Sequence, residues 1–157
     1  MSQENSVMPV RQLCTFSVDG LMFGVDVIHV QEVIRSQDMT PVPLASGVIS
    51  GLINLRGQIV TALDMRVKLG RPARSPDQAS TNVVLRHAEG VLSLLVDEIG
   101  DVVEVDADTF EEPPGTLPSN SRAIIDGVYK LSPQLLLLLN IERAVRVESQ
   151  QTRFENA

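Results

Sequence analysis

Short runs of β-forming residues recur along this chain, joined in pairs by two-residue turns. In the first pair, Asp19-Gly20 separates Cys14 to Val18 from Leu21 to Val25. An Asp-Gly turn between such runs is typical of a β-hairpin, because both turn positions must tolerate a positive φ. Three more hairpins are predicted, with turns at Arg56-Gly57, Glu89-Gly90 and Ser132-Pro133. So many hairpins in a chain of 157 residues predict a mostly antiparallel β fold without βαβ units.

Several predicted strands are apolar at successive positions, as in Val83 to Leu85, Leu92 to Val96 and Leu135 to Leu139. Strands buried on both faces favour a closed barrel with a second layer packed outside it, here a second barrel. The proline-containing segment 71–80 is the least structured internal stretch and separates two sets of strands. Short helices are expected after Asp64 and, at the end of the chain, after Asn140.

Composition excludes several classes of function. The chain has 13 Lys and Arg against 20 Asp and Glu, a net charge of −7, which opposes binding to a phosphate backbone. The single cysteine, Cys14, and the absence of an apolar run of about 20 residues favour a soluble, cytoplasmic protein without membrane insertion. His29 and His87 are the only histidines, and no metal-ligand spacing, phosphate-binding loop or nucleophile elbow is present. We therefore expect no enzyme activity, no cofactor and no metal, and a surface that binds protein.

Three features are candidates for that surface. Arg56 sits at a predicted hairpin tip, where its guanidinium could present donors to a partner, and Asn54 can tie the turn through its amide. Val30 and Glu32 share one face of a predicted strand, a combination of apolar and charged groups that suits an interface. Leu117 follows two prolines and is expected at the exposed tip of a rigid loop. Each pattern is also compatible with an ordinary solvated or core residue.

These features, in this order, resemble the CheW family of bacterial chemosensory coupling proteins. The resemblance extends from about Leu13 to Val145. It is carried by the first hairpin from Phe16 to Val25, by Val27 to Arg35, by Gly51 to Val60 with Leu63 to Arg66, and by Leu94 to Ile99.

The resemblance implies two SH3-like five-stranded antiparallel β-barrels packed on a shared hydrophobic core, with short helices. It places a single domain at residues 13–150, with barrels at roughly 13–75 and 76–141, a C-terminal helix at 141–149, and flexible tails at 1–12 and 150–157. It also implies a non-enzymatic adaptor in two-component signal transduction. Its partners would be the cytoplasmic signalling tip of chemoreceptors, the regulatory domain of the histidine kinase CheA, and other CheW copies in array rings at the inner face of the membrane.

The same resemblance assigns residues to each partner. The receptor-binding set is Val30, Glu32, Gly51, Asn54, Arg56 and Val102. The kinase-binding residue is Leu117. Other functions stay open: a CheW-like adaptor of a pilus or second-messenger pathway, a β-barrel RNA-binding protein, and a small hydrolase. The acidic charge and the scarcity of aromatic residues disfavour the second of these, and the missing base and nucleophile disfavour the third.

Overall fold

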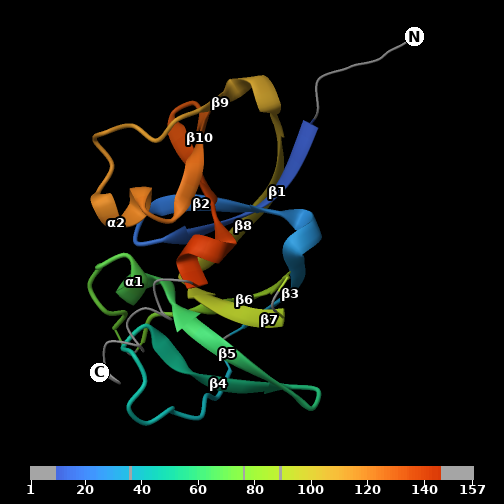
Figure 1. Cartoon of the computed structure of the whole chain (residues 1–157), viewed down its shortest axis with the longest axis vertical. Helices are drawn as coiled ribbons and strands as arrows, with labels where there is room; N and C mark the ends of the chain where they lie inside the picture. The colour runs from blue at the N-terminus through green and yellow to red at the C-terminus, as the bar shows by residue number, and fades with distance from the viewer. Residues whose placement is uncertain (1–9, 36, 76, 89, 146–157) are drawn as a thin grey trace.

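Two β-sheets, one above the other, make up most of the molecule (Figure 1). The computed structural model describes residues 10–35, 37–75, 77–88 and 90–145. The first sheet contains β1 (Val10–Val18), β2 (Leu21–Asp26), β8 (Glu98–Asp106), β9 (Phe110–Glu111), β10 (Ile125–Leu131) and β11 (Gln134–Leu139). The second contains β3 (Val30–Arg35), β4 (Ile49–Leu55), β5 (Gln58–Asp64), β6 (Thr81–His87) and β7 (Gly90–Val96). We call them the six-stranded and the five-stranded sheet.

Short helical segments connect the strands or cap the sheets. They are η2 (Val27–His29), α1 (Met65–Lys68), η3 (Ala107–Thr109) and α2 (Ser119–Arg122), followed by helical residues 141–145. The carboxylate of Asp64 accepts a hydrogen bond from the Arg66 N–H at 2.9 Å, which caps α1 as predicted. Asn140 Oδ1 accepts from the Arg143 N–H at 2.9 Å and caps the terminal helical segment in the same way. None of the described helices is long and apolar enough to cross a membrane.

The predicted hairpins are present. β1 pairs with β2, β4 with β5, β6 with β7 and β10 with β11, all antiparallel. At the first turn φ is 49° for Asp19 and 84° for Gly20, and at the second it is 52° for Arg56 and 90° for Gly57. Two successive positive φ values give a turn whose twist matches that of the strands, which is why the Asp-Gly pattern was informative.

The mostly β fold with two units is confirmed, and the structure refines how the strands join. The order is β8-β1-β2-β11-β10-β9 in one sheet and β3-β6-β7-β5-β4 in the other, so both sheets are open. Each sheet also contains one parallel pair, β2 with β11 and β5 with β7. The edge strand β9 has only two residues. It is followed closely by Pro113 and Pro114, which have no N–H to donate to a sheet.

The sheets do not divide the chain at residues 75 and 76, where the sequence placed the boundary between barrels. The six-stranded sheet takes strands from both ends of the chain, and the five-stranded sheet takes the strands between them. The reason is that β8 pairs with β1 and β11 pairs in parallel with β2, so strands from the second half of the chain flank the first hairpin. Val10–Gln12, expected in a tail, belong to β1. The other tail residues and positions 146–149 of the expected helix lie outside the described residues.

One large core is shared between the sheets, as predicted. Phe16 and Phe23 from the six-stranded sheet stack with ring centroids 5.7 Å apart and belong to the same buried cluster as Leu85 and Leu94. A smaller cluster lies on the other side of each sheet, around Leu136 in one and around Ile53, Leu55, Val60 and Val84 in the other. Val83 and Val84 therefore face different cores, which explains why that strand is apolar at successive positions.

Candidate functional site

Glu32 and Arg56 form a two-pronged ion pair at one edge of the five-stranded sheet. Arg56 Nη1 donates to Glu32 Oε2 at 2.9 Å, and Arg56 Nη2 donates to Glu32 Oε1 at 2.6 Å. Glu32 is on β3 and Arg56 is in the turn after β4, and these strands are at opposite ends of the sheet order. The sheet therefore curls until its edges meet, and side chains rather than backbone hydrogen bonds join them at this point.

The ion pair favours the charged form of both groups. The hydrogen bonds from Arg56 lower the pKa of the Glu32 carboxyl, and those to Glu32 raise the pKa of the Arg56 guanidinium. The Arg56 side chain is 75% exposed and that of Glu32 is 17% exposed. The expected free fork of donors at the hairpin tip is thus partly occupied, and a partner would meet a preformed Glu-Arg pair. The sequence named both residues but contained no signal that they touch.

Two other receptor-assigned residues shape this edge from within. Asn54 Oδ1 accepts from the Gly57 N–H at 2.8 Å and closes the turn that carries Arg56, as predicted. Gly51 is buried beneath Met39 and Thr40, because Thr40 and Leu52 form an isolated β-bridge there. A Cβ at Gly51 would lie 2.8 Å from Thr40 O and 2.9 Å from Met39 Cβ, so only glycine permits this approach.

A groove runs between the two sheets on the side of β3 and β8. One part of its lining is β3, with Val33, Ile34 and Arg35, and another is the start of β8 with the residue before it, Asp97, Glu98 and Ile99. Residues 79–81 complete the groove. Val33 is 39% exposed and Ile99 is 40% exposed, so the groove has apolar side chains open to a partner and charged side chains beside them. The sequence contained no signal for either residue, because only the folded chain brings β3 and β8 to the same groove.

The structure places the remaining assigned residues apart from one another. Val30 is half-buried and packs against the shared core at the start of β3. Val102 is 58% exposed on β8, in the other sheet and three residues beyond Ile99. Glu32, Asn54 and Arg56 therefore form one group at the edge of the five-stranded sheet, whereas Val102 belongs to β8 of the six-stranded sheet.

Leu117 is not at an exposed tip, and that expectation was wrong. Its side chain is half-buried and packs against the shared core. The loop turns back on itself, with the Leu117 N–H donating to Pro114 O at 3.2 Å and Arg122 Nε donating to Leu117 O at 3.1 Å. An apolar side chain on a loop that folds over the core gains more from burial than from exposure.

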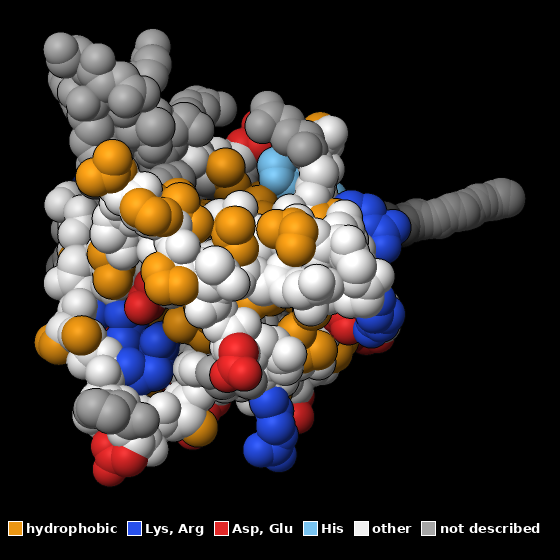
Figure 2. Space-filling model, turned by 90° about the horizontal axis from the view of Figure 1, so that it is seen from below, with side chains coloured by type: hydrophobic (Ala, Val, Ile, Leu, Met, Phe, Trp, Pro, Cys, Tyr) orange, Lys and Arg blue, Asp and Glu red, His pale blue; other side chains and the backbone are white. Residues whose placement is uncertain are grey.

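Exposed apolar side chains gather on the underside of the molecule, the side on which the five-stranded sheet lies (Figure 2). Among the residues of that sheet and its connections, Leu44 is 96% exposed and Ile59 is 61% exposed.

At the junction of the sheets, both histidines, His29 and His87, line one cleft together with Arg11, Asp26 and Asp126. Within the described ranges, no group of three or more His, Cys, Asp or Glu side chains is placed to hold a metal ion.

Comparisons with known proteins agree on one family. A family model described as a CheW-like domain matches residues 12–149. The chemotaxis protein CheW of Klebsiella aerogenes is 27% identical over 138 residues, covering 88% of this chain and 83% of that protein. Protein PilI of Pseudomonas aeruginosa is 25% identical over 114 residues, covering 73% of this chain and 64% of PilI. The crystal structure of the scaffolding protein TtCheW from Thermoanaerobacter tengcongensis has a TM-score of 0.75 at 24% identity, covering 83% of this chain and 89% of that one.

Proposed function

Because this chain belongs to the CheW-like family, whose model matches residues 12–149, we propose that it couples the cytoplasmic tips of chemoreceptors to the histidine kinase CheA. The family consists of non-enzymatic scaffold proteins that act in chemotaxis. Two sheets around one shared core give such a scaffold separate surfaces held at a fixed relation, so that two partners can bind at once. The protein would then be located at the inner face of the membrane through its receptor rather than through a segment of its own.

The groove between the sheets is the observation that best supports a helical receptor partner. Val33 and Ile99 supply an apolar centre, and Arg35 and Glu98 supply charges of both signs beside it. This pattern suits an amphipathic helix whose apolar stripe lies in the groove. The receptor tip is a helical hairpin, and its stripe would contact Val33, Ile99 and the exposed Val102.

The assigned receptor residues then divide into two roles. Arg56, Glu32 and Val102 are exposed enough to touch the receptor, and the Glu-Arg pair would set the polar register of the helix. The other three residues would support the site without touching the receptor. Val30 packs β3 against the core, Gly51 leaves room for the segment around Thr40, and Asn54 closes the turn that carries Arg56. Substitution of any of these three residues would weaken receptor binding by changing the shape of this edge of the five-stranded sheet.

The kinase is proposed to bind a different surface, around the loop that contains Leu117 on the six-stranded sheet. Half-burial of Leu117 means that it supports this loop and offers only part of its side chain to CheA. Additional copies of the chain in array rings would add contacts of modest strength. When several weak contacts form within one array, the overall affinity rises through multivalency even though no single interface is strong.

A charge reversal at the ion pair tests the receptor surface. Arg56→Glu places two carboxylates together in the position of the pair, and we expect binding of a receptor signalling-domain fragment to fall while circular dichroism stays unchanged. Lys130→Glu is the matched control, because Lys130 is also an exposed cation, paired with Glu111 at 3.4 Å within the six-stranded sheet. Undiminished receptor binding by Arg56→Glu would count against this surface.

The similarity to PilI favours one alternative, an adaptor of a non-flagellar pathway such as pilus motility. Deletion of the gene in its own host separates the two. Loss of swimming chemotaxis with intact surface motility supports the flagellar role, and the reverse supports the alternative.

A further inference from the structure

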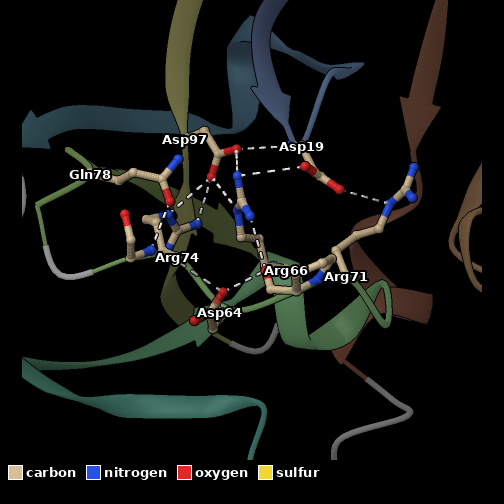
Figure 3. A network of polar contacts seen from close by, with 9 residues as sticks. Asp19, Asp64, Arg66, Arg71, Arg74, Gln78 and Asp97 are labelled. Atoms are coloured by element: carbon tan, nitrogen blue, oxygen red, sulfur yellow. Dashed lines mark hydrogen bonds and ion pairs between the residues drawn. The ribbon is translucent and has the colours of Figure 1, made fainter.

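A network of buried charges joins the two sheets at the point where the chain crosses between them (Figure 3). Its centre is Asp97, the single residue between the end of β7 and the start of β8. Asp97 accepts hydrogen bonds from Arg66 Nε at 2.9 Å and from Arg66 Nη2 at 2.8 Å. It also accepts from Arg74 Nε at 3.0 Å and from the backbone N–H of Asp19 at 2.7 Å.

The partners of Asp97 come from both sheets. Asp19 lies in the turn between β1 and β2, in the six-stranded sheet, whereas Arg66 is in α1, directly after β5 of the five-stranded sheet. Arg66 Nη2 also approaches Asp19 Oδ1 at 3.7 Å, and Arg71 Nε approaches Asp19 Oδ2 at 3.6 Å. The Asp97 N–H donates to Ser17 O at 3.0 Å, which adds a backbone link to β1.

The network is buried and balanced in charge. The side chains of Arg66, Arg74 and Asp97 are 8%, 10% and 18% exposed. Asp64 contributes a further carboxylate, 3.8 Å from Arg74 Nη1, and three arginines face three aspartates in all. Buried ion pairs add little net stability over apolar packing, because desolvation offsets their attraction. The two parallel hydrogen bonds from Arg66 to Asp97 do fix the relative direction of these side chains, because a planar guanidinium meets a carboxylate in this way in one arrangement only.

The position of the network connects it to the groove. Asp97 itself lines the groove, next to Glu98 and Ile99. Residues 79–81 line it as well, and they follow the segment whose Arg74 is held by Asp97. The network is therefore continuous with groove walls on both sides of the crossing.

We propose that Asp19, Asp64, Arg66, Arg71, Arg74 and Asp97 form an inter-sheet clamp that sets the angle between the two sheets and thereby the width of the groove. These are positioning residues, since none is required to touch the partner. The link to receptor binding rests on the proposed function, but the effect on the angle between the sheets does not.

The test measures the distance between one labelled site on each sheet, which changes when the sheets move relative to each other. Spin labels at Gln58→Cys on β5 and Ser132→Cys in the β10–β11 turn report the distance between the sheets by pulsed electron resonance; both sites are exposed, whereas Cys14 is buried. The clamp variants are Asp97→Asn, which is isosteric, and Arg74→Gln, a milder change that keeps the test valid if the first variant fails to fold. Glu111→Gln is the control, because it removes a carboxylate paired with Lys130 within one sheet.

We expect the distance distribution to broaden or shift in both clamp variants and to match the unmutated chain in Glu111→Gln, with circular dichroism unchanged throughout. Affinity for a receptor fragment should fall roughly two- to thirtyfold in the clamp variants, the range seen when residues remote from a ligand modulate binding. Receptor binding should narrow the distribution again, because the receptor selects one angle.

Unaltered distributions in folded clamp variants would overturn the clamp, whatever the receptor does. Failure of the unmutated chain to bind any receptor fragment would instead overturn the proposed function and leave the distance result standing. Reduced affinity with an unaltered distribution would also contradict the clamp, because it would place the effect in direct contacts.

Discussion

Replacing Asp97 by asparagine should make the stability of the protein less dependent on pH in acid. Burial alone raises the pKa of the Asp97 carboxyl, but hydrogen bonds from Arg66, from the Asp19 N–H and from Arg74 outweigh it and lower the pKa from 3.8 to about 2. A lowered pKa means that the ionised form stabilises the fold above the unfolded pKa and that this contribution is lost as pH falls through the folded one. With one pKa unit equal to about 1.4 kcal/mol, the contribution is about 2 kcal/mol at pH 7 and about 1 kcal/mol at pH 3.

The assay is urea unfolding of the unmutated chain, Asp97→Asn and the control Glu111→Gln at both pH values. At pH 7 we expect Asp97→Asn to lower the free energy of unfolding by about 2 kcal/mol or somewhat more, because Arg66 is left buried with fewer acceptors. The difference in the free energy of unfolding between the unmutated chain and Asp97→Asn should be smaller at pH 3, where the Asp97 carboxyl begins to be protonated. The exposed Glu111 pair should contribute less than about 1 kcal/mol. A difference that is the same at both pH values, or below about 0.5 kcal/mol at pH 7, would refute the electrostatic reasoning.

Three further outcomes follow from the geometry. Gly51→Ala should lower the free energy of unfolding by roughly 1–3 kcal/mol, as measured by urea unfolding, because the new Cβ would lie 2.8 Å from Thr40 O; a neutral change would mean that the covering segment moves freely. Val33→Asp should weaken receptor-fragment binding in titration calorimetry without unfolding the protein, and unchanged affinity would exclude the groove as the receptor site. Leu117→Asp should weaken kinase association more than receptor association in pull-downs, whereas equal loss of both would indicate general misfolding.

Local structure was predictable where one residue type is required by the backbone. Asp19-Gly20 and Arg56-Gly57 occupy turns with two positive φ values, and few residue pairs tolerate that conformation. The shared core was predictable because Val83 and Val84 are both apolar, which an exposed strand face would not favour.

Long-range pairing was not predictable, because it depends on which strands meet after the hairpins form. The pairing of β2 with β11 brings the two ends of the chain into one sheet. The chain is therefore not divided into two consecutive halves, as the sequence had suggested. The strand β8 was hidden in a run of carboxylates, since an edge strand exposed along most of its length has no alternation of apolar and polar residues.

The candidate site was predictable only as a set of residues. Glu32 and Arg56 were both named, but their contact depends on the curl of the five-stranded sheet, which brings its two edges together. The segment after the prolines was recognised as a loop, but the direction of Leu117 was not, because loop sequence does not encode which side chain turns toward the core. The groove residues Val33 and Ile99 become neighbours only once both sheets are in place.

Reconstitution of a receptor signalling-domain fragment with CheA, with and without this chain, tests the adaptor role most directly. We expect receptor control of kinase autophosphorylation to appear only when the chain is added, and we expect Arg56→Glu to fail to restore it while Lys130→Glu succeeds. Receptor control of the kinase that is equally strong in the absence of the chain, or a chain that binds neither partner, would contradict it.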